Sequence, residues 1–273
     1  NRPMVAINQW EQAEDSMYTL CGKDRIHPST DGHLVMAYLF LKAQGLAGKP
    51  VADIRIDGAG KKVTRSDNCR VSDLSVSSDN LTFTYEAKSL PYPIDTSYYD
   101  NEKHTQADAL SVIPFMDEMN YEGLSVSGLS DGYYGLTIGG EFIGRFTARE
   151  LERGINMALL QNTPQYKQAM KIRQMNEERW LKERKMREFY WVEYNLMRKT
   201  GMLWACNEAA VDTLRKYRPH DIFLQWNGDL WLQYMHKGIR EDCVNEQQDL
   251  VNQIYEQNKP IPLRIEIKKF TDL

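Results

Sequence analysis

The sequence predicts an α+β protein in three parts: a short helical segment at residues 1–48, a β-rich unit at 49–146, and a mainly helical extension at 147–273 that ends in a strand. Three observations support this division. The first part has apolar residues at helical spacing before a glycine stop. The second alternates apolar and polar residues between turn signals, and the third carries one unusually long helical pattern.

Composition limits the classes of protein to which the chain can belong. It has 273 residues, of which 42% are hydrophobic and 26% charged, as in ordinary globular proteins with a sizeable core. A formal net charge of -4 gives no electrostatic reason to expect a nucleic-acid partner. The longest apolar run, Leu34 to Leu41, is far shorter than the roughly 20 residues that span a bilayer. We therefore expect no transmembrane segment.

The predicted helix of the first part covers residues 31–44. Ser29, Thr30 and Asp31 are candidate N-caps, and Gly45 supplies the stop signal. The chain begins NRPMVAINQW, without an initiator methionine or a signal-peptide pattern. We therefore expect this start to lie in the interior of a longer polypeptide.

Two hairpin patterns define the β-rich unit. In the first, alternating residues over 74–85 are interrupted by a polar turn at 78–80. In the second, strands on either side of a Gly-Gly turn at 139–140 extend over 136–142. Short strands at this spacing predict a small β-sandwich-like unit.

Two N-terminal signals open the helical extension. Thr147 and Glu150 form a capping box that predicts a helix through Leu160. The Thr-Pro pair at 163–164 places a proline at the first position of a second helix. Its pattern continues to about Arg198, which gives a length of about 50 Å at 1.5 Å per residue. Such a helix is either a coiled-coil arm or a brace.

The sequence pattern specifies the secondary structure of the rest of the extension less clearly. Residues 226–229, WNGD, could form a hairpin turn, although residues 229–240 could equally be helical, and LRIEI at 263–267 alternates as a strand. The aromatic run FYWVEY at 189–194, with Trp204, Trp226 and Trp231, could stack on a sugar. Burial against the β-rich unit is the commoner outcome for such residues.

The chemistry is carried by Asp24 and His27, three positions apart in a turn before the first helix. A serine that attacks an ester must lose its proton, and a histidine can accept that proton and return it to the leaving group. An aspartate fixes the tautomer of the ring and stabilises the imidazolium. Alone, an Asp-x-x-His pair is also typical of a structural hydrogen bond at a helix start.

The surrounding stretch DRIHPSTDGHLVMAYLFLKAQGL resembles the last block of the SGNH hydrolases, the GDSL-type lipases and acylhydrolases. Residues 124–169 are also similar to the downstream extension of a bacterial branch of that family. The resemblance implies that 1–48 is the C-terminal end of a flavodoxin-like α/β domain, with His27 as catalytic base and Asp24 as its orienting partner. It further implies an acyl-ester substrate, such as an acetylated carbohydrate or a lipid, and a periplasmic or secreted location.

The nucleophile of that family, in a Gly-Asp-Ser block, is not in this chain. Ser125, Ser127 and Ser130 read as ordinary strand and turn residues. Since a triad acts as a unit, we expect the 273 residues to be inactive alone and the serine to come from a missing N-terminal segment. The alternative is a non-catalytic glycan- or protein-binding module in which the Asp-His pair is a relic.

No metal or organic cofactor is expected. The histidines outside the candidate pair lack the short spacings of a metal site. The charged run at 171–188 has the i,i+4 pairs of a solvated helix face rather than of a nucleic-acid interface. The four cysteines allow three pairings, and their wide spacing favours mostly buried free thiols; they are Cys21, Cys69, Cys206 and Cys243.

Overall fold

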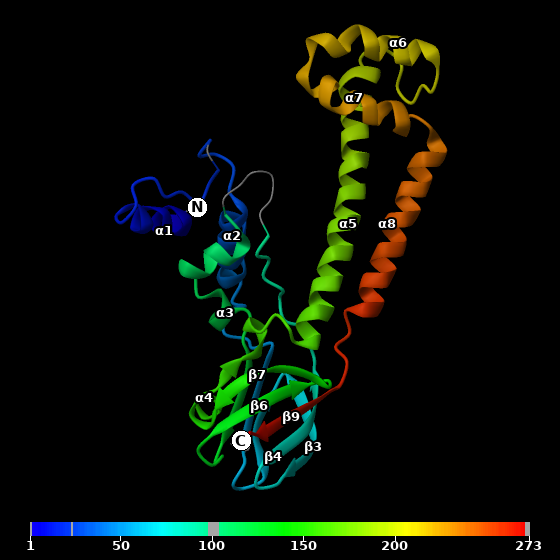
Figure 1. The fold of residues 1–273 in the computed structure, drawn as a ribbon. Coiled ribbons are helices and arrows are strands. Elements are labelled where there is room, and N and C mark those ends of the chain that lie inside the picture. The colour runs from blue at the N-terminus through cyan, green and yellow to red at the C-terminus, as the bar shows by residue number, and fades with distance from the viewer. Residues whose placement is uncertain (1, 23, 98–103, 271–273) are drawn as a thin grey trace. The chain divides into compact units, whose positions relative to one another are not determined.

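The computed structural model describes residues 2–22, 24–97 and 104–270. The chain divides into two compact units. The first comprises Asn1–Met170 together with Lys259–Leu273, and the second comprises Lys171–Asn258 (Figure 1). Because the chain contains both helices and strands, the mixed α+β class is confirmed. No helix in the described part of the chain combines the length and apolarity needed to cross a bilayer.

Two helices, α1 (Arg2–Gln12) and α2 (Thr30–Ala43), begin the first unit. The predicted helix over 31–44 is confirmed as α2, which ends before Gly45, where φ is +74°. Its buried side chains pack with those of the short helices η1 (Gln106–Ser111) and α3 (Phe115–Glu118). The described residues of 1–48 contribute a single isolated bridge and no extended strand, so the sheet of a flavodoxin-like domain is not seen there.

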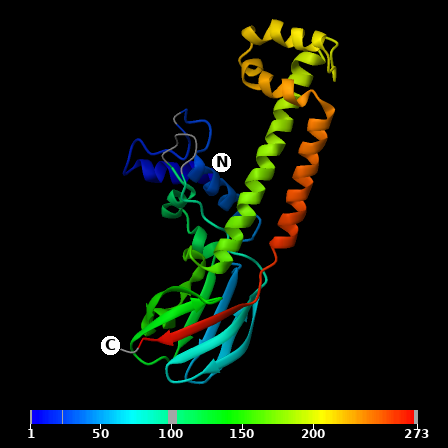
Figure 2. The same cartoon turned by 45° about the vertical axis from the view of Figure 1, so that its right-hand side comes forward.

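Nine strands form two sheets in the first unit, with orders β2-β1-β5-β8 and β3-β4-β9-β6-β7 among the described residues. Figure 2 shows β9, drawn in red, lying between its neighbours β4 and β6. Both predicted hairpins are confirmed, as the antiparallel pairs β3–β4 and β6–β7. The strands are β1 (Ala52–Asp57), β2 (Lys62–Asp67), β3 (Cys69–Val76), β4 (Asn80–Ala87), β5 (Glu122–Ser127), β6 (Tyr133–Ile138), β7 (Glu141–Thr147), β8 (Ile155–Asn156) and β9 (Leu263–Lys269).

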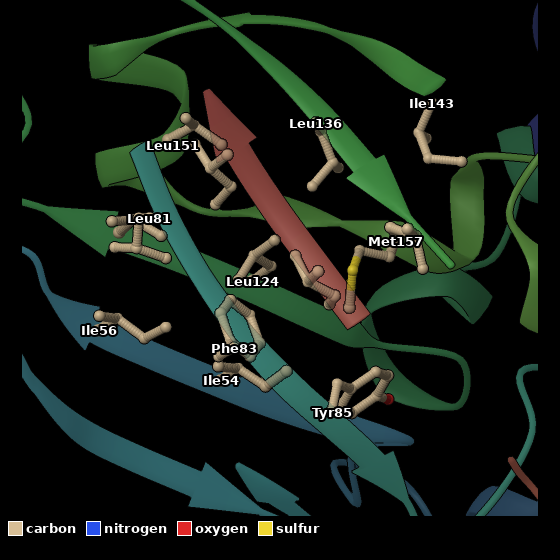
Figure 3. Packing of buried hydrophobic residues seen from close by; sticks show 14 of the residues in the cluster. Ile54, Ile56, Leu81, Phe83, Tyr85, Leu124, Leu136, Ile143, Leu151 and Met157 are labelled. Carbon is tan, nitrogen blue, oxygen red and sulfur yellow. The ribbon is translucent and has the colours of Figure 1, made fainter. Parts of the chain in front are cut away.

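Apolar side chains from both sheets make one core (Figure 3). Ile54 and Leu124 come from one sheet, Phe83 and Leu136 from the other, and all four are fully buried. Each such side chain contributes about 1.5–3 kcal/mol relative to exposure. The apolar residues of the alternating pattern that predicted the hairpins are thus the side chains that face the core between the two sheets.

The capping box of Thr147 and Glu150 is confirmed, but the helix that it opens, α4 (Ala148–Arg153), is much shorter than predicted. The expectation of a helix through Leu160 is wrong. Gly154 adopts φ +93° and ends α4, after which β8 returns to pair with β5. The Asn156 side chain then accepts from the backbone N–H of Glu122, which fixes the chain against the sheet instead of continuing the helix.

The long predicted helix is confirmed as α5 (Pro164–Val192), which continues as one π-helical stretch, η3 (Glu193–Met197). The WNGD segment lies inside α7 (Ile222–Tyr234), so its interpretation as a hairpin turn is wrong. The Asp221 side chain caps the first N–H groups of α7 and thereby favours the helix. The remaining helices of the second unit are α6 (Glu208–Tyr217) and α8 (Lys237–Gln257).

The aromatic residues of the second unit are divided between core and surface. Phe189 and Trp231 are fully buried in a cluster made by the helices of this unit itself. The expectation of burial against the β-rich unit is therefore wrong for this pair. Trp204 and Trp226 keep 47% and 66% of their surface exposed.

Candidate functional site

Asp24 and His27 meet in the turn that joins α1 to α2. The ring Nδ1 of His27 lies 2.6 Å from Oδ2 of Asp24. The other carboxylate oxygen, Oδ1, accepts the backbone N–H groups of Ile26, at 2.9 Å, and of His27, at 3.1 Å. The turn closes by a 2.7 Å bond from the N–H of Gly22 to the carbonyl of His27. The sequence-predicted pair is therefore in direct contact.

The charge of the Asp24 carboxylate determines the tautomer of the His27 ring. The hydrogen bond from His27, followed by the two backbone N–H groups, lowers the pKa of Asp24 to about 2. At neutral pH the carboxylate is ionised and can only accept, so Nδ1 of His27 must be the donor. In the neutral ring the lone pair is then on Nε2. The side chain of His27 is 83% exposed, which leaves this nitrogen open to a reacting group.

The turn is held against the first turn of α2. Both the N–H and the hydroxyl of Ser29 donate to the carbonyl of Leu20, each at 3.1 Å. Ser29 occupies the N-cap position but makes no side-chain cap bond, so its hydroxyl fixes the turn instead. The buried carboxylate of Asp31 accepts from the Ser29 hydroxyl and from the N–H of Gly32.

Gly32 packs against the turn that carries the pair, a role that was not predicted from the sequence. A Cβ at Gly32 would lie 1.9 Å from the carbonyl oxygen of Leu20, so no larger residue fits without moving the turn. The signal was present in the sequence as a glycine in the first turn of an otherwise apolar helix, where glycine costs about 1 kcal/mol relative to alanine. Close approach of Leu20 explains that choice.

A second histidine lies near the same turn. His104 Nδ1 is 3.6 Å from Oδ2 of Asp31, although the two are far apart in sequence. His33 is exposed on α2, while His220 and His236 belong to the second unit. Within residues 2–22, 24–97 and 104–270, no three His, Cys, Asp or Glu side chains are arranged to hold a metal ion.

The three serines weighed as nucleophiles are engaged elsewhere in the β-rich part. Ser125 donates to the carbonyl of Glu152, and Ser127 to that of Ile56. The Ser130 hydroxyl lies 3.1 Å from the Tyr134 hydroxyl and accepts from Lys269. The hydrogen bonds of these hydroxyls are therefore those of strand and turn residues.

Exposed apolar side chains occur in the turn and along α2. Ile26, inside the turn, is 74% exposed. On α2, Met36 and Phe40 are 42% and 64% exposed, opposite the buried side chains of Leu34 and Val35. A helix that is apolar on all sides is typical of one that is covered on all sides.

Comparison with known proteins gives two likenesses. Residues 170–259 match a family described as the diltiazem deacetylase C-terminal helical domain. The matched range agrees with the second unit, Lys171–Asn258, to within one residue at each end. No curated protein matches the chain.

The second likeness is to a solved structure, BT4096, a gut microbial diltiazem-metabolizing enzyme. The two chains share 42% sequence identity and superpose with a TM-score of 0.93. The match covers 99% of this chain and 61% of the other. The present chain therefore shares that fold over nearly its whole length and spans about three fifths of the enzyme it resembles.

Proposed function

We propose that this chain is part of a serine esterase of the SGNH type that removes acyl groups, acetyl groups above all, from ester substrates. In this proposal His27 is the catalytic base and Asp24 orients it. The observation that carries the proposal is the 2.6 Å contact between an ionised carboxylate and Nδ1, which leaves Nε2 free to accept a proton. The likeness to a diltiazem-metabolizing enzyme and to a deacetylase domain supports the reaction class.

The proposed reaction uses His27 twice. Its Nε2 takes the proton of a serine hydroxyl while the serine oxygen bonds to the ester carbonyl carbon. The imidazolium then gives this proton to the leaving alcohol as the carbon–oxygen bond of the ester breaks. A water molecule repeats both steps on the acyl-serine and releases the free acid. Asp24 stabilises the imidazolium in both halves of the reaction.

The serine of this proposal comes from outside the 273 residues. Two observations support that source: the related enzyme is longer than this chain, and the serines of the β-rich part bond to other groups. Ile26, the residue before His27, is 74% exposed, and the segment with the serine would pack on it. The 273 residues alone are then expected to be inactive.

The proposed substrate is an acyl ester, and an acetyl ester of a small aromatic molecule is the first choice. This choice follows from the names of the two matches, both of which refer to diltiazem, and one of which refers to deacetylation. Acetylated carbohydrates and lipids belong to the same reaction class and serve as comparison substrates.

The alternative, a non-catalytic binding module, is favoured by one observation in the second unit. The rings of Phe223 and Trp226 are both exposed, with centroids 5.4 Å apart, and Trp191 lies 5.2 Å from Phe223. Such a platform fits stacking on a sugar or a partner side chain. It is compatible with catalysis elsewhere in the same protein.

Rates of acetyl-ester hydrolysis by the complete gene product test the proposal. Diltiazem and p-nitrophenyl acetate are the substrates, and His27→Asn is the variant. Loss of a general base predicts a fall in kcat/KM of about 10²–10⁴-fold or more. His33→Asn, on the exposed face of the following helix, is the matched control and is expected to keep wild-type rates. Equal rates for wild type and His27→Asn would contradict the proposal.

A further inference from the structure

A second pair of nucleophile and base lies in the helical unit. The sulfur of Cys206 is 3.3 Å from Nδ1 of His236, and both residues are exposed. Cys206 lies in the loop that leads into α6, and His236 occupies the residue before α8. The fold therefore brings together two residues that are 30 positions apart in the sequence.

Both members of the pair lie at the starts of helices. Cys206 stands just before the N-terminus of the ten-residue α6, and its partner stands at the N-terminus of the 21-residue α8. Helix N-termini carry a partial positive charge that stabilises anions. The side chain of Asn207 caps α6. His236 occupies the N-cap position of α8, but its side chain makes no cap bond to that helix.

We propose that Cys206 and His236 form a nucleophile–base pair that makes Cys206 a site of thiol–disulfide exchange with low-molecular-weight disulfides such as glutathione disulfide. Nδ1 of His236 takes the thiol proton. The thiolate attacks one sulfur of the disulfide, forms a mixed disulfide with it and expels the other sulfur as a thiolate. That thiolate takes the proton back from the imidazolium, so no oxidant other than the disulfide is needed.

The other cysteines of the chain provide internal comparisons. Cys69 is buried, and burial raises the pKa of its thiol to about 11. Cys243 is also buried and donates to the backbone carbonyl of Lys182. Cys21 is partly buried beside Pro28. Cys206 alone among the four combines an exposed side chain with a contact to an imidazole.

The proposal does not depend on the esterase function. Both members of the pair belong to the second unit, whereas Asp24 and His27 belong to the first. Loss of exchange at Cys206 leaves the esterase proposal untouched, and the converse also holds.

The test follows the rate at which native protein reacts with Ellman's reagent, with the modified residue identified by mass spectrometry. We expect one fast equivalent in the wild type, its loss in Cys206→Ser and its retention in Cys21→Ser. His236→Asn keeps a residue that suits the start of a helix but lacks a basic nitrogen, and it should slow the fast phase at least about threefold. His220→Asn, in the same unit, is the matched control and should react as the wild type does.

Two further measurements separate a reactive thiol from a merely accessible one. In concentrated urea the wild type and His236→Asn are expected to react at the same rate, because the pair exists only in the folded protein. Incubation of native protein with glutathione disulfide is expected to place the adduct on Cys206. A fast phase that survives in Cys206→Ser, or a wild-type rate in folded His236→Asn, would overturn the proposal.

Discussion

Glu122, at the start of β5, is expected to make the first unit less stable as the pH rises. Its side chain is fully buried, and its Oε1 accepts both the Tyr85 hydroxyl, at 2.9 Å, and Nε2 of Gln165, at 3.2 Å. Its Oε2 has no hydrogen-bond partner among the described residues, and the same is true of the buried Oε1 of Gln165. Burial without a cation raises the pKa of Glu122 to about 7.

The magnitude follows from the difference between the two pKa values. The folded protein binds the proton more tightly than the unfolded chain, in which the pKa is about 4.5. The free energy of unfolding is therefore highest below pH 4.5 as far as this group is concerned and falls as the pH rises through 7. Each unit of difference between the two pKa values corresponds to about 1.36 kcal/mol. The loss is therefore complete above pH 7 and amounts to about 3 kcal/mol.

Glu122→Gln removes the titrating group and keeps the shape of the side chain. We expect the variant to be about 3 kcal/mol more stable than the wild type well above pH 7, and the gain to shrink as the pH falls toward 5. Hydrogen exchange of the amides in β4 and β5 is the assay, because it reports on this unit separately from the helical one. The control is Glu14→Gln, at an exposed position before α2. If the difference in unfolding free energy between wild type and Glu122→Gln were the same near pH 5 and well above pH 7, the reasoning would be refuted.

Three further changes test other parts of the account. Gly32→Ala places a Cβ against the Leu20 carbonyl and should cost about 1–3 kcal/mol in unfolding free energy, with a shift of the His27 ring signals in NMR spectra; unchanged signals would contradict the close packing. The Asp24 carboxyl should titrate at about 2 in the wild type and closer to 4 in His27→Asn, as followed by carbon-13 NMR, because the ring bond is the main cause of the lowered pKa. Trp231→Phe removes the 2.8 Å bond from Nε1 to the buried Glu193 and should destabilise the helical unit by about 1–3 kcal/mol in denaturant unfolding; a neutral effect would contradict a structural role for that bond.

Much of the fold could be predicted because the signals were local. The alternation around 78–80 and the Gly-Gly turn at 139–140 each specify a hairpin through neighbouring residues. The Thr-Pro start at 163–164 likewise marks the beginning of α5. The strand at 263–267 was also evident, but its position between β4 and β6 depends on pairing with residues more than 120 positions away. No local pattern carries that information.

The errors occurred where tertiary contacts decide the outcome. The helix after Thr147 stops at Gly154 because the side chain of Asn156 accepts the backbone N–H of Glu122, at the start of β5. The WNGD segment is helical because Asp221 caps α7, although Asn-Gly favours a turn in isolation. At the candidate site the Asp24–His27 contact could be predicted from spacing alone. The close packing of Gly32 against Leu20 could not be predicted, because it depends on where the fold places the Leu20 carbonyl.

The central claim is that His27 of this chain activates a serine that lies outside the 273 residues. The most direct measurement is labelling of the complete gene product with a fluorophosphonate, which reacts with activated serines, followed by mass spectrometry to locate the label. The account predicts one labelled serine outside these residues, with labelling lost in His27→Asn and kept in His33→Asn. A label on Ser125, Ser127 or Ser130, or labelling that persists in His27→Asn, would contradict it.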